Sequence, residues 1–458
     1  MPLHEARSAM PVSREELFAW HSRPGAFDRL APPWETLRVI ERGGGIEAGG
    51  FLHMALKKGP LWLRWDAEHT DYDPPGRFVD RQVRGPFAEW VHEHLCLESG
   101  GGRSELHDRV TYRLPGGALG QALGGAKASR DLRRLFAFRH ARTRRDLERH
   151  AAFADRGSLR IAVTGASGLV GSALTAFLRG GGHEVVRLVR REPREGEVRW
   201  DPSSGVADRA GLEGLDALVH LAGENIASGR WNAARKESIR RSRVEGTRVL
   251  SECLASLNSP PGVLVSASAI GYYGNRGDET VDEASAPGEG FLADVCREWE
   301  AAAEAARHAG IRVVHLRIGV VMAAKGGALP RMLTPFRLGL GGRLGSGRQV
   351  MSWIGLDDLV GVFQRAIMDE GLSGPANAVA PGALTNAEFT KVLAKVLRRP
   401  ALFPAPAQAI RLAAGEMGEA LLLGGARVVP RALQGAGHAF LTPDLESALR
   451  WEMGLPQG

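Results

Sequence analysis

A turn containing three glycines constrains the fold of this chain more than any other part of its sequence. The apolar run Leu159–Thr164 is typical of a buried strand, and the segment after the turn has the apolar periodicity of a helix. Gly165 can form the tight turn, Gly168 lets the backbone approach a ligand, and Gly171 permits close packing of helix on strand. Backbone N–H groups at the start of such a helix attract phosphate, so the turn predicts a binding loop for the pyrophosphate of a dinucleotide. The residues expected to contact it are Gly165, Ala166, Ser167, Gly168, Leu169, Val170 and Gly171.

The chain around and after this loop alternates apolar strands with helical segments. The strand-like runs are LRIAVTG, HEVVRLV, ALVHLAG, GVLVSAS and RVVHLRIG. Strands joined through helices lie parallel, and an apolar parallel sheet is covered by helices on both faces. Residues 159–375 are therefore predicted to form an α/β Rossmann domain with a doubly wound parallel sheet.

The second strand of this domain indicates which dinucleotide binds. Sites for NAD place a carboxylate at the end of this strand, but here Val189 is followed by Arg190 and Arg191. Guanidinium groups suit a 2′-phosphate, so NADP(H) is favoured over NAD(H), although both arginines could also be ordinary solvated charges. After the third strand, the small loop Leu221, Ala222 and Gly223 is expected beneath the adenine and ribose. His220, inside that apolar strand, is interpreted as a core residue.

The first 153 residues have a different pattern of predicted strands and helices. A helix over Arg14–His21 precedes short β-like runs between Leu37 and Leu114, and an arginine-rich helix follows over Ala126–Phe153. This pattern resembles the α+β helix-grip fold of START-like, polyketide-cyclase-type proteins. The resemblance implies a sheet wrapped on its last helix around an apolar cavity, and an apolar small molecule as ligand. The arginines are interpreted as the solvated face of that helix rather than as a nucleic-acid site.

His92, His94 and Cys96 alternate along one predicted strand and should share a face. Successive pairs lie about 6.6 Å apart by the usual rise per residue, which argues against one shared ion. No metal site is predicted, and the three residues are expected to line the wall of the N-terminal domain.

Length and composition set the remaining limits. With 458 residues the chain is too long for one hydrophobic core. Near Ala154–Ser158 the predicted antiparallel strands give way to strands that alternate with helices, which predicts a domain boundary there. Residues 376–458 are predicted to be a mostly helical C-terminal extension. No apolar run reaches the roughly 18 residues of a membrane span, and the first residues do not form a secretory signal, so a cytoplasmic protein is expected. The three cysteines are odd in number and far apart, which favours reduced thiols.

Several longer motifs resemble one protein family. They are AGENIASGRWNAARKESIRRSRVEGTRVL, VSASAIGYYG, FLADVCREWE, SWIGLDDLV and ANAVAPGALTNAEF. They are similar to the bacterial epimerase family of atypical or extended short-chain dehydrogenase/reductases. Members carry a C-terminal domain of unknown function, matched here by about residues 399–450, and some carry an N-terminal START-like domain. The most distinctive residues are Arg230, Trp231, Lys236, Ser242 and Arg243.

The resemblance raises a catalytic question. Related reductases and epimerases use a Ser/Thr, Tyr and Lys set with a Tyr-x-x-x-Lys helix, but this chain has Leu292 and Cys296 at those positions. Ser268 matches the serine position. Tyr272 and Tyr273 are near enough in sequence to line the same cleft, or could form a structural turn. Glu300 and Asp294 are weaker candidates for proton transfer, and Cys296 is interpreted as a small buried apolar residue.

Two functions remain open on this evidence. One is an NADP(H)-binding oxidoreductase or epimerase/dehydratase-like enzyme with a rearranged proton donor, acting on a small molecule. The other is a module that senses NADPH or a ligand without turnover. Arg230 and Lys236 could bind an anionic substrate, or could serve packing.

Overall fold

A computed structural model describes residues 1–456, apart from the side chains of residues 206 and 207. Contacts within the chain divide it into two units. The N-terminal unit holds Met1–Gly157 together with Ala176–His183 and Met453–Pro456, and the C-terminal unit holds Ser158–Thr175 and Glu184–Glu452. Residues after 376, predicted as a separate extension, therefore cluster mainly with the dinucleotide-binding part of the chain.

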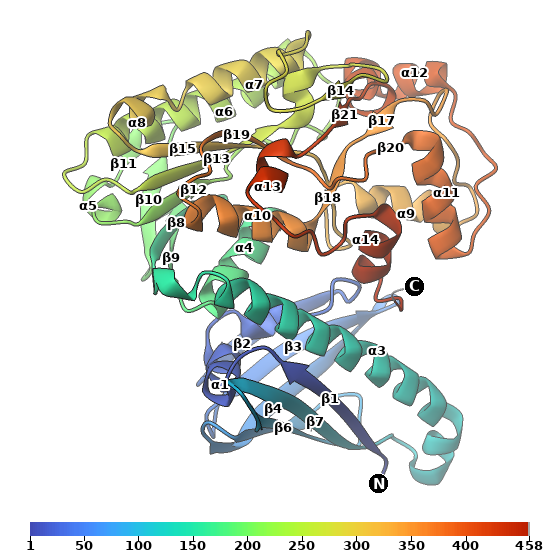
Figure 1. Cartoon of the computed structure of the whole chain (residues 1–458). Coiled ribbons are helices and arrows are strands. Elements are labelled where there is room, and N and C mark those ends of the chain that lie inside the picture. The colour runs from blue at the N-terminus through green and yellow to red at the C-terminus, as the bar shows by residue number, and fades with distance from the viewer. Residues whose placement is uncertain (457–458) are drawn as a thin grey trace. The chain divides into compact units, whose positions relative to one another are not determined.

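The N-terminal unit is built on a seven-stranded antiparallel sheet with the strand order β1-β7-β6-β5-β4-β3-β2 (Figure 1). Its elements are β1 (Leu3–Met10), α1 (Arg14–Ser22), α2 (Ala26–Leu30), β2 (Leu37–Gly43), β3 (Phe51–Lys58), β4 (Leu61–Asp73), β5 (Arg77–Arg84), β6 (Glu89–Gly100), β7 (Arg103–Arg113) and α3 (Gly117–Ala151), with a short 3₁₀ turn at Ala154–Arg156. The antiparallel strands are confirmed. Strand β1 was not predicted, and α3 begins nine residues before the predicted start at Ala126.

The interior of this unit corrects two expectations. Arg142 of α3 is buried and lies 5.0 Å from the ring of Phe138, so the arginines do not all belong to a solvated face. His92, His94 and Cys96 do share one buried face of β6, as predicted. Around them the interior contains further charged side chains, whereas the resemblance implied an apolar cavity.

The C-terminal unit is built on an eight-stranded sheet with the order β11-β10-β9-β8-β12-β13-β15-β19, parallel except for β10 with β11. In its first half lie β8 (Arg160–Thr164), α4 (Leu169–Gly180), β9 (Glu184–Val189), β10 (Glu197–Asp201), β11 (Val206–Ala207), α5 (Arg209–Leu212), β12 (Ala217–His220), α6 (Ala233–Ala255), β13 (Val263–Ala269), a 3₁₀ turn η2 (Ile270–Tyr273), β14 (Thr280–Val281), α7 (Phe291–Ala301) and α8 (Glu304–His308). In its second half lie β15 (Arg312–Ile318), β16 (Val320–Met322), α9 (Leu329–Arg337), β17 (Val350–Met351), β18 (Trp353–Gly355), α10 (Leu356–Met368), β19 (Gly374–Ala378), β20 (Leu384–Thr385), α11 (Asn386–Leu397), α12 (Ala407–Gly418), a π-helical turn η3 (Glu419–Leu423), β21 (Arg427–Val428), α13 (Arg431–Gly435) and α14 (Leu445–Glu452).

This strand order confirms the predicted Rossmann-like architecture. Helices α6, α7 and α8 lie on one side of the sheet, and α4 and α10 lie on the other (Figure 1). From β8 the chain winds outward through β9 and β10, and then returns to β12 and continues the opposite way. The carboxyl ends of β8 and β12 thus meet at the topological switch point, where sheets of this kind bind ligands.

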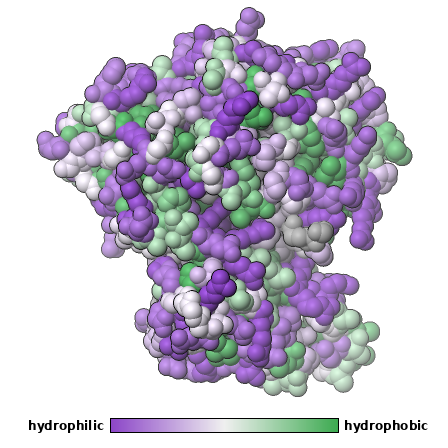
Figure 2. All heavy atoms as spheres, in the orientation of Figure 1, coloured by the Kyte–Doolittle hydropathy of each residue, from purple (hydrophilic) through white to green (hydrophobic). Residues whose placement is uncertain are grey.

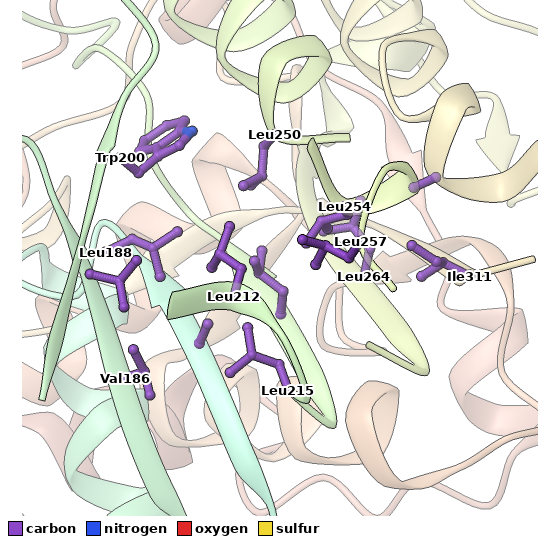
Figure 3. Close-up of a cluster of buried hydrophobic side chains, with 14 of the residues drawn as sticks. Val186, Leu188, Trp200, Leu212, Leu215, Leu250, Leu254, Leu257, Leu264 and Ile311 are labelled. Carbon is purple, nitrogen blue, oxygen red and sulfur yellow. The ribbon is translucent and has the colours of Figure 1, made fainter. Parts of the chain in front are cut away.

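A core of aliphatic side chains fixes this sheet against its helices. Trp200 of β10 and Leu264 of β13 lie in one cluster with Leu250 and Leu254 of α6 (Figure 3). Leu218 of β12 belongs to the same cluster, and all five side chains are at most 3% exposed. Each of these side chains is worth about 1.5–3 kcal/mol when buried, so the strands that end at the switch point have little freedom to shift.

Hydrophilic side chains cover most of the face in Figure 2. Within residues 1–456 no helix is both long enough and apolar enough to cross a bilayer.

Candidate functional site

The glycine turn between β8 and α4 has the geometry that the sequence predicts. Gly165 adopts φ +64°, a conformation that other residues rarely take. A Cβ atom on Gly171 would lie 2.2 Å from the carbonyl oxygen of Gly165, so only glycine lets α4 start this close to the strand. The Gly168 N–H donates to the same oxygen over 2.9 Å, while Ser167 and Gly168 themselves are exposed. The loop is a bare backbone cradle that a diphosphate can approach.

Thr164, at the end of β8, joins this loop to the end of β12. Its hydroxyl oxygen accepts hydrogen bonds from the N–H groups of Leu221 (2.9 Å) and Ala222 (3.1 Å) and bonds Nδ1 of His220 over 2.8 Å. His220 is fully buried, and desolvation lowers its pKa to about 4, so the core interpretation is confirmed. The loop Leu221–Gly223 consequently lies directly beside Gly165, where a Cβ would meet the Leu221 carbonyl at 3.0 Å.

The two arginines after β9 lie in different surroundings. Arg191 forms a bidentate ion pair with Glu197, at 2.7 Å for each contact. Its hydrogen bonds, together with that of the Arg194 backbone N–H, lower the pKa of Glu197 to about 2. Arg190 is exposed and forms no such pair among the described residues. Of the two side chains, Arg190 is the one free to turn toward a ligand.

Ser268 belongs to a buried polar network at the end of β13. Its hydroxyl donates to Glu300 of α7 over 2.7 Å, and Glu300 is held by Arg317 of β15 through two hydrogen bonds of 2.9 and 2.8 Å. Arg317 is 3% exposed. Burial alone would lower its pKa, but the hydrogen bonds and the charge of Glu300 outweigh burial and raise the pKa above its usual value. Ser268 is also 3% exposed. The serine and the carboxylate are therefore positioned to pass a proton between them.

The two tyrosines of η2 have opposite environments. Tyr273 is fully buried; its hydroxyl donates to Asn377 over 2.7 Å and accepts from Arg317 over 3.0 Å. Tyr272 is half-buried, and its ring lies 3.4 Å from the Arg317 guanidinium carbon. No described residue hydrogen-bonds the Tyr272 hydroxyl. Tyr272 can thus meet a substrate, whereas Tyr273 is committed to the protein interior.

This difference predicts unequal effects of removing the two hydroxyls. Tyr273→Phe should lower the free energy of unfolding by about 1–3 kcal/mol, because Asn377 and Arg317 each lose a buried partner. Tyr272→Phe should change it by less than about 0.5 kcal/mol. Chemical denaturation of the two variants checks this. A loss below about 0.5 kcal/mol for Tyr273→Phe would show that its two hydrogen bonds add little stability.

Helix α7 carries the residues that replace the expected Tyr–Lys pair. A Cβ atom on Gly271 would lie 3.2 Å from Cβ of Leu292 and 3.8 Å from Sγ of Cys296, so both side chains pack directly under η2. Cys296 is 3% exposed, and burial raises its pKa to about 12, which confirms it as an unreactive packed thiol. Asp294, by contrast, is exposed on the helix and cannot serve Ser268.

Arg230 and Lys236 both contact the C-terminal helix α12. Nε of Arg230 donates to the Ala413 carbonyl over 3.0 Å, and Nζ of Lys236 pairs with Glu416 over 2.6 Å. Lys236 also lies 5.0 Å from the ring of Phe291. In this structure Arg230, in the loop before α6, and Lys236, in the first turn of α6, both bind α12. This is the packing alternative of the sequence analysis.

Sequence reasoning missed Arg317, Asn377 and Thr164. Each lies at or near the carboxyl end of its strand, and a single polar residue at such a position indicates a candidate site residue. Arg317 in RVVHLRIG was the clearest such signal, because an unpaired arginine is not tolerated inside a buried strand.

Comparisons with known proteins agree with this geometry. Residues 161–377 match the NAD dependent epimerase/dehydratase family, and residues 405–452 match a domain of unknown function, DUF1731. The epimerase family protein Mb2239 of Mycobacterium bovis is 46% identical over 297 residues, which is 65% of this chain and 98% of that protein.

Two solved structures are similar to parts or all of the chain. The nucleoside-diphosphate sugar epimerase from Corynebacterium glutamicum superposes with a TM-score of 0.82 at 37% identity, covering 98% of this chain and 90% of that one. The human epimerase family protein SDR39U1, solved with NADPH, covers 64% of this chain and 99% of its own, with a TM-score of 0.59 at 36% identity. On the strength of these matches and of its glycine loop, the chain belongs to the NAD dependent epimerase/dehydratase family and carries a C-terminal DUF1731 domain.

Proposed function

We propose that the C-terminal unit binds NADP(H), with the pyrophosphate on the loop from Gly165 to Gly171. The main support is that a Cβ on Gly171 would lie 2.2 Å from the Gly165 carbonyl oxygen. Only glycine therefore permits this tight loop, and the loop exposes its backbone to phosphate. The loop lies at the topological switch point, and Leu221 to Gly223 form the neighbouring wall for the adenine and ribose.

The preference for NADP(H) over NAD(H) is assigned to Arg190. Its exposed guanidinium follows β9, where a ribose 2′-phosphate would lie, while Arg191 is paired with Glu197 and contributes positive charge from further away. The human relative was solved with NADPH, which supports the same choice here. When bound, such a cofactor supplies or removes hydride.

Calorimetric titration of the full chain with NADPH and with NADH tests this assignment. NADPH should bind saturably below millimolar concentration, and Arg190→Ala should weaken it about 10- to 100-fold, the value of a lost charge-assisted phosphate contact. Arg190→Ala should leave the binding of NADH unchanged, because NADH has no 2′-phosphate. Arg191→Ala is the matched control and should have the smaller effect, because that side chain already has an anionic partner. A preference for NADH in the unaltered chain would contradict the proposal.

We further propose that the unit is an oxidoreductase or epimerase/dehydratase-like enzyme acting on a small molecule. Ser268 and Tyr272 are its candidates for contact with the reacting group, and Glu300 would exchange a proton with the Ser268 hydroxyl over their 2.7 Å hydrogen bond. Arg317 keeps Glu300 in place and is a positioning residue. Tyr273, predicted alongside Tyr272, is assigned a structural role because both of its hydrogen-bond capacities are used.

A second candidate is a module that senses NADPH without turnover. Leu292 and Cys296 favour it, because neither can take part in proton transfer, and Ser268 is only 3% exposed. Incubation with NADPH and a panel of carbonyl compounds separates the two. Oxidation of NADPH that Tyr272→Phe or Ser268→Ala slows supports the enzyme. Stable NADPH in the presence of saturable binding is the result that the sensor predicts, and it contradicts net reduction of these compounds.

The N-terminal unit is proposed to be a START-like domain. The supporting pattern is a curved antiparallel sheet in which two short helices follow β1 and the long helix α3 follows β7. Such a domain would present a small molecule, with the ligand's chemistry set by the side chains inside the sheet.

A further inference from the structure

The N-terminal unit contains a buried cluster of three histidines and two aspartates that the dinucleotide site does not use. The cluster consists of Asp80 on β5, His92 and His94 on β6, Asp108 on β7 and His140 on α3. All face the interior between the sheet and α3, and Asp108 and His92 are at most 3% exposed. Buried charge of this density requires a specific partner.

Three of these side chains converge on one point. Oδ2 of Asp80 lies 3.2 Å from Nδ1 of His92 and 3.2 Å from Nε2 of His94, and the three ligand atoms lie within 4.8 Å of one another. Ligands bound tetrahedrally at about 2.1 Å from an ion are separated by roughly 3.4 Å, so the observed spacing needs little adjustment. Two nitrogens and one carboxylate oxygen form the 2-His-1-carboxylate set that divalent first-row metals favour.

This geometry overturns the spacing argument made from the sequence. Alternate residues of a strand are separated by more than 6 Å along the backbone, as the usual rise requires. The side chains of His92 and His94 nevertheless lean together, and their ring centroids are 3.7 Å apart. Cys96, the third residue of the predicted face, packs instead with Met10, Leu17 and Phe78. Asp80, which the sequence analysis did not consider, completes the set.

The opposite edges of both rings are held by a second carboxylate. Asp108 Oδ1 lies 3.1 Å from Nε2 of His92 and 2.8 Å from Nδ1 of His94, and its other oxygen lies 2.7 Å from Nε2 of His140. Metal-binding histidines commonly donate their remaining N–H to a carboxylate, which fixes the tautomer and orients the ring. Nε2 of His92 forms such a hydrogen bond with Asp108, whereas Nδ1 of His94 lies close to Asp108 without hydrogen-bond geometry.

We propose that Asp80, His92 and His94 bind a divalent first-row transition-metal ion, with Asp108 as the outer residue that orients His92 and His140 as the residue that holds Asp108. Part of Asp80 remains exposed, with 17% of its side chain accessible, so a fourth ligand such as water or a small-molecule oxygen can enter from that side. The site would give the interior of this unit a polar anchor for its ligand.

Metal loading of the full-length chain without an affinity tag tests the proposal. The protein is stripped with chelator, dialysed against Zn²⁺ with excess Mg²⁺, and its zinc content measured by mass spectrometry. We expect one zinc per chain. Asp80→Asn and His94→Gln should weaken Zn²⁺ binding at least tenfold, and Asp108→Asn about 10- to 100-fold. His107→Gln is the matched control, because His107 is a buried histidine of the same sheet that contacts Glu5 instead of the cluster. It should bind zinc normally.

X-ray absorption of the zinc-loaded unaltered chain keeps the test independent of variant folding. The proposal predicts two imidazole ligands with Zn–N distances of about 2.0–2.1 Å. Failure of the unaltered chain to retain zinc, full retention by folded Asp80→Asn and His94→Gln, or a shell without imidazole would each overturn it.

Discussion

Replacement of Gly171 by alanine is expected to weaken NADPH binding at least a hundredfold. The new methyl group would lie 2.2 Å from the Gly165 carbonyl oxygen and 2.8 Å from Cα of Ala166. Both atoms belong to the backbone, so the loop itself must move rather than a flexible side chain. Loss of two backbone hydrogen bonds to charged phosphate, at roughly 1.5 kcal/mol each, accounts for this factor. The strain should also lower the free energy of unfolding by about 1–3 kcal/mol.

Gly435→Ala provides the matched control for this substitution. Gly435 ends helix α13, its φ is not positive, and no atom lies within 4 Å of the place where its Cβ would be. That variant should bind NADPH as the unaltered chain does. Calorimetry and denaturation of both variants provide the comparison. Tight NADPH binding by Gly171→Ala would show that the loop is not the pyrophosphate site.

Arg317→Met is expected to produce the largest loss of stability, about 3–5 kcal/mol, which is typical when one partner of a buried ion pair is removed. Arg317 is 3% exposed and forms two hydrogen bonds with Glu300 and one with the Tyr273 hydroxyl. Its removal leaves the Glu300 carboxylate facing Ser268 without a counter-charge. The Tyr272 ring also loses the guanidinium against which it packs.

A more exposed ion pair provides the control. Arg240 of α6 makes the same bidentate contact with Glu298 of α7, at 2.6 and 2.8 Å, but the two side chains are 51% and 35% accessible. Exposed pairs contribute little, so Arg240→Met should leave the denaturation midpoint nearly unchanged. Urea denaturation of the two variants measures the difference. Similar midpoints would contradict the prediction, because the buried Arg317–Glu300 pair would then contribute no more stability than the Arg240–Glu298 pair.

The sequence predicted those parts of the C-terminal unit that depend on local pattern. The strand, the glycine turn and the helix are consecutive, and each glycine has a steric reason that can be read from its spacing. The doubly wound parallel sheet followed from the alternation of strands and helices. The core role of His220 followed from its place in a run of apolar residues.

The Ser268 network could not be predicted in the same way. Ser268, Glu300 and Arg317 come from β13, α7 and β15, and no short segment contains two of them. Tyr272 and Tyr273 are neighbours in sequence, yet one is half-buried and the other fully buried, because η2 turns their side chains in different directions. Only the packing of these elements decides which hydroxyl a substrate can reach.

The N-terminal unit illustrates the same limit. Alternation along β6 correctly predicted that His92 and His94 share a face. The close approach of their rings, with centroids 3.7 Å apart, depends on side chains of the neighbouring strands. Asp80 and Asp108 lie on those strands, 12 residues or more away in sequence from the nearest histidine of the pair. A pattern within one strand contains no information on such partners.

Hydrogen–deuterium exchange of the full chain with and without saturating NADPH tests the central claim most directly. The account predicts slower exchange of the backbone amides of residues 165–171 and 221–223, since these N–H groups and their neighbours would face the cofactor. Saturable NADPH binding that leaves exchange in residues 165–171 unchanged would contradict it.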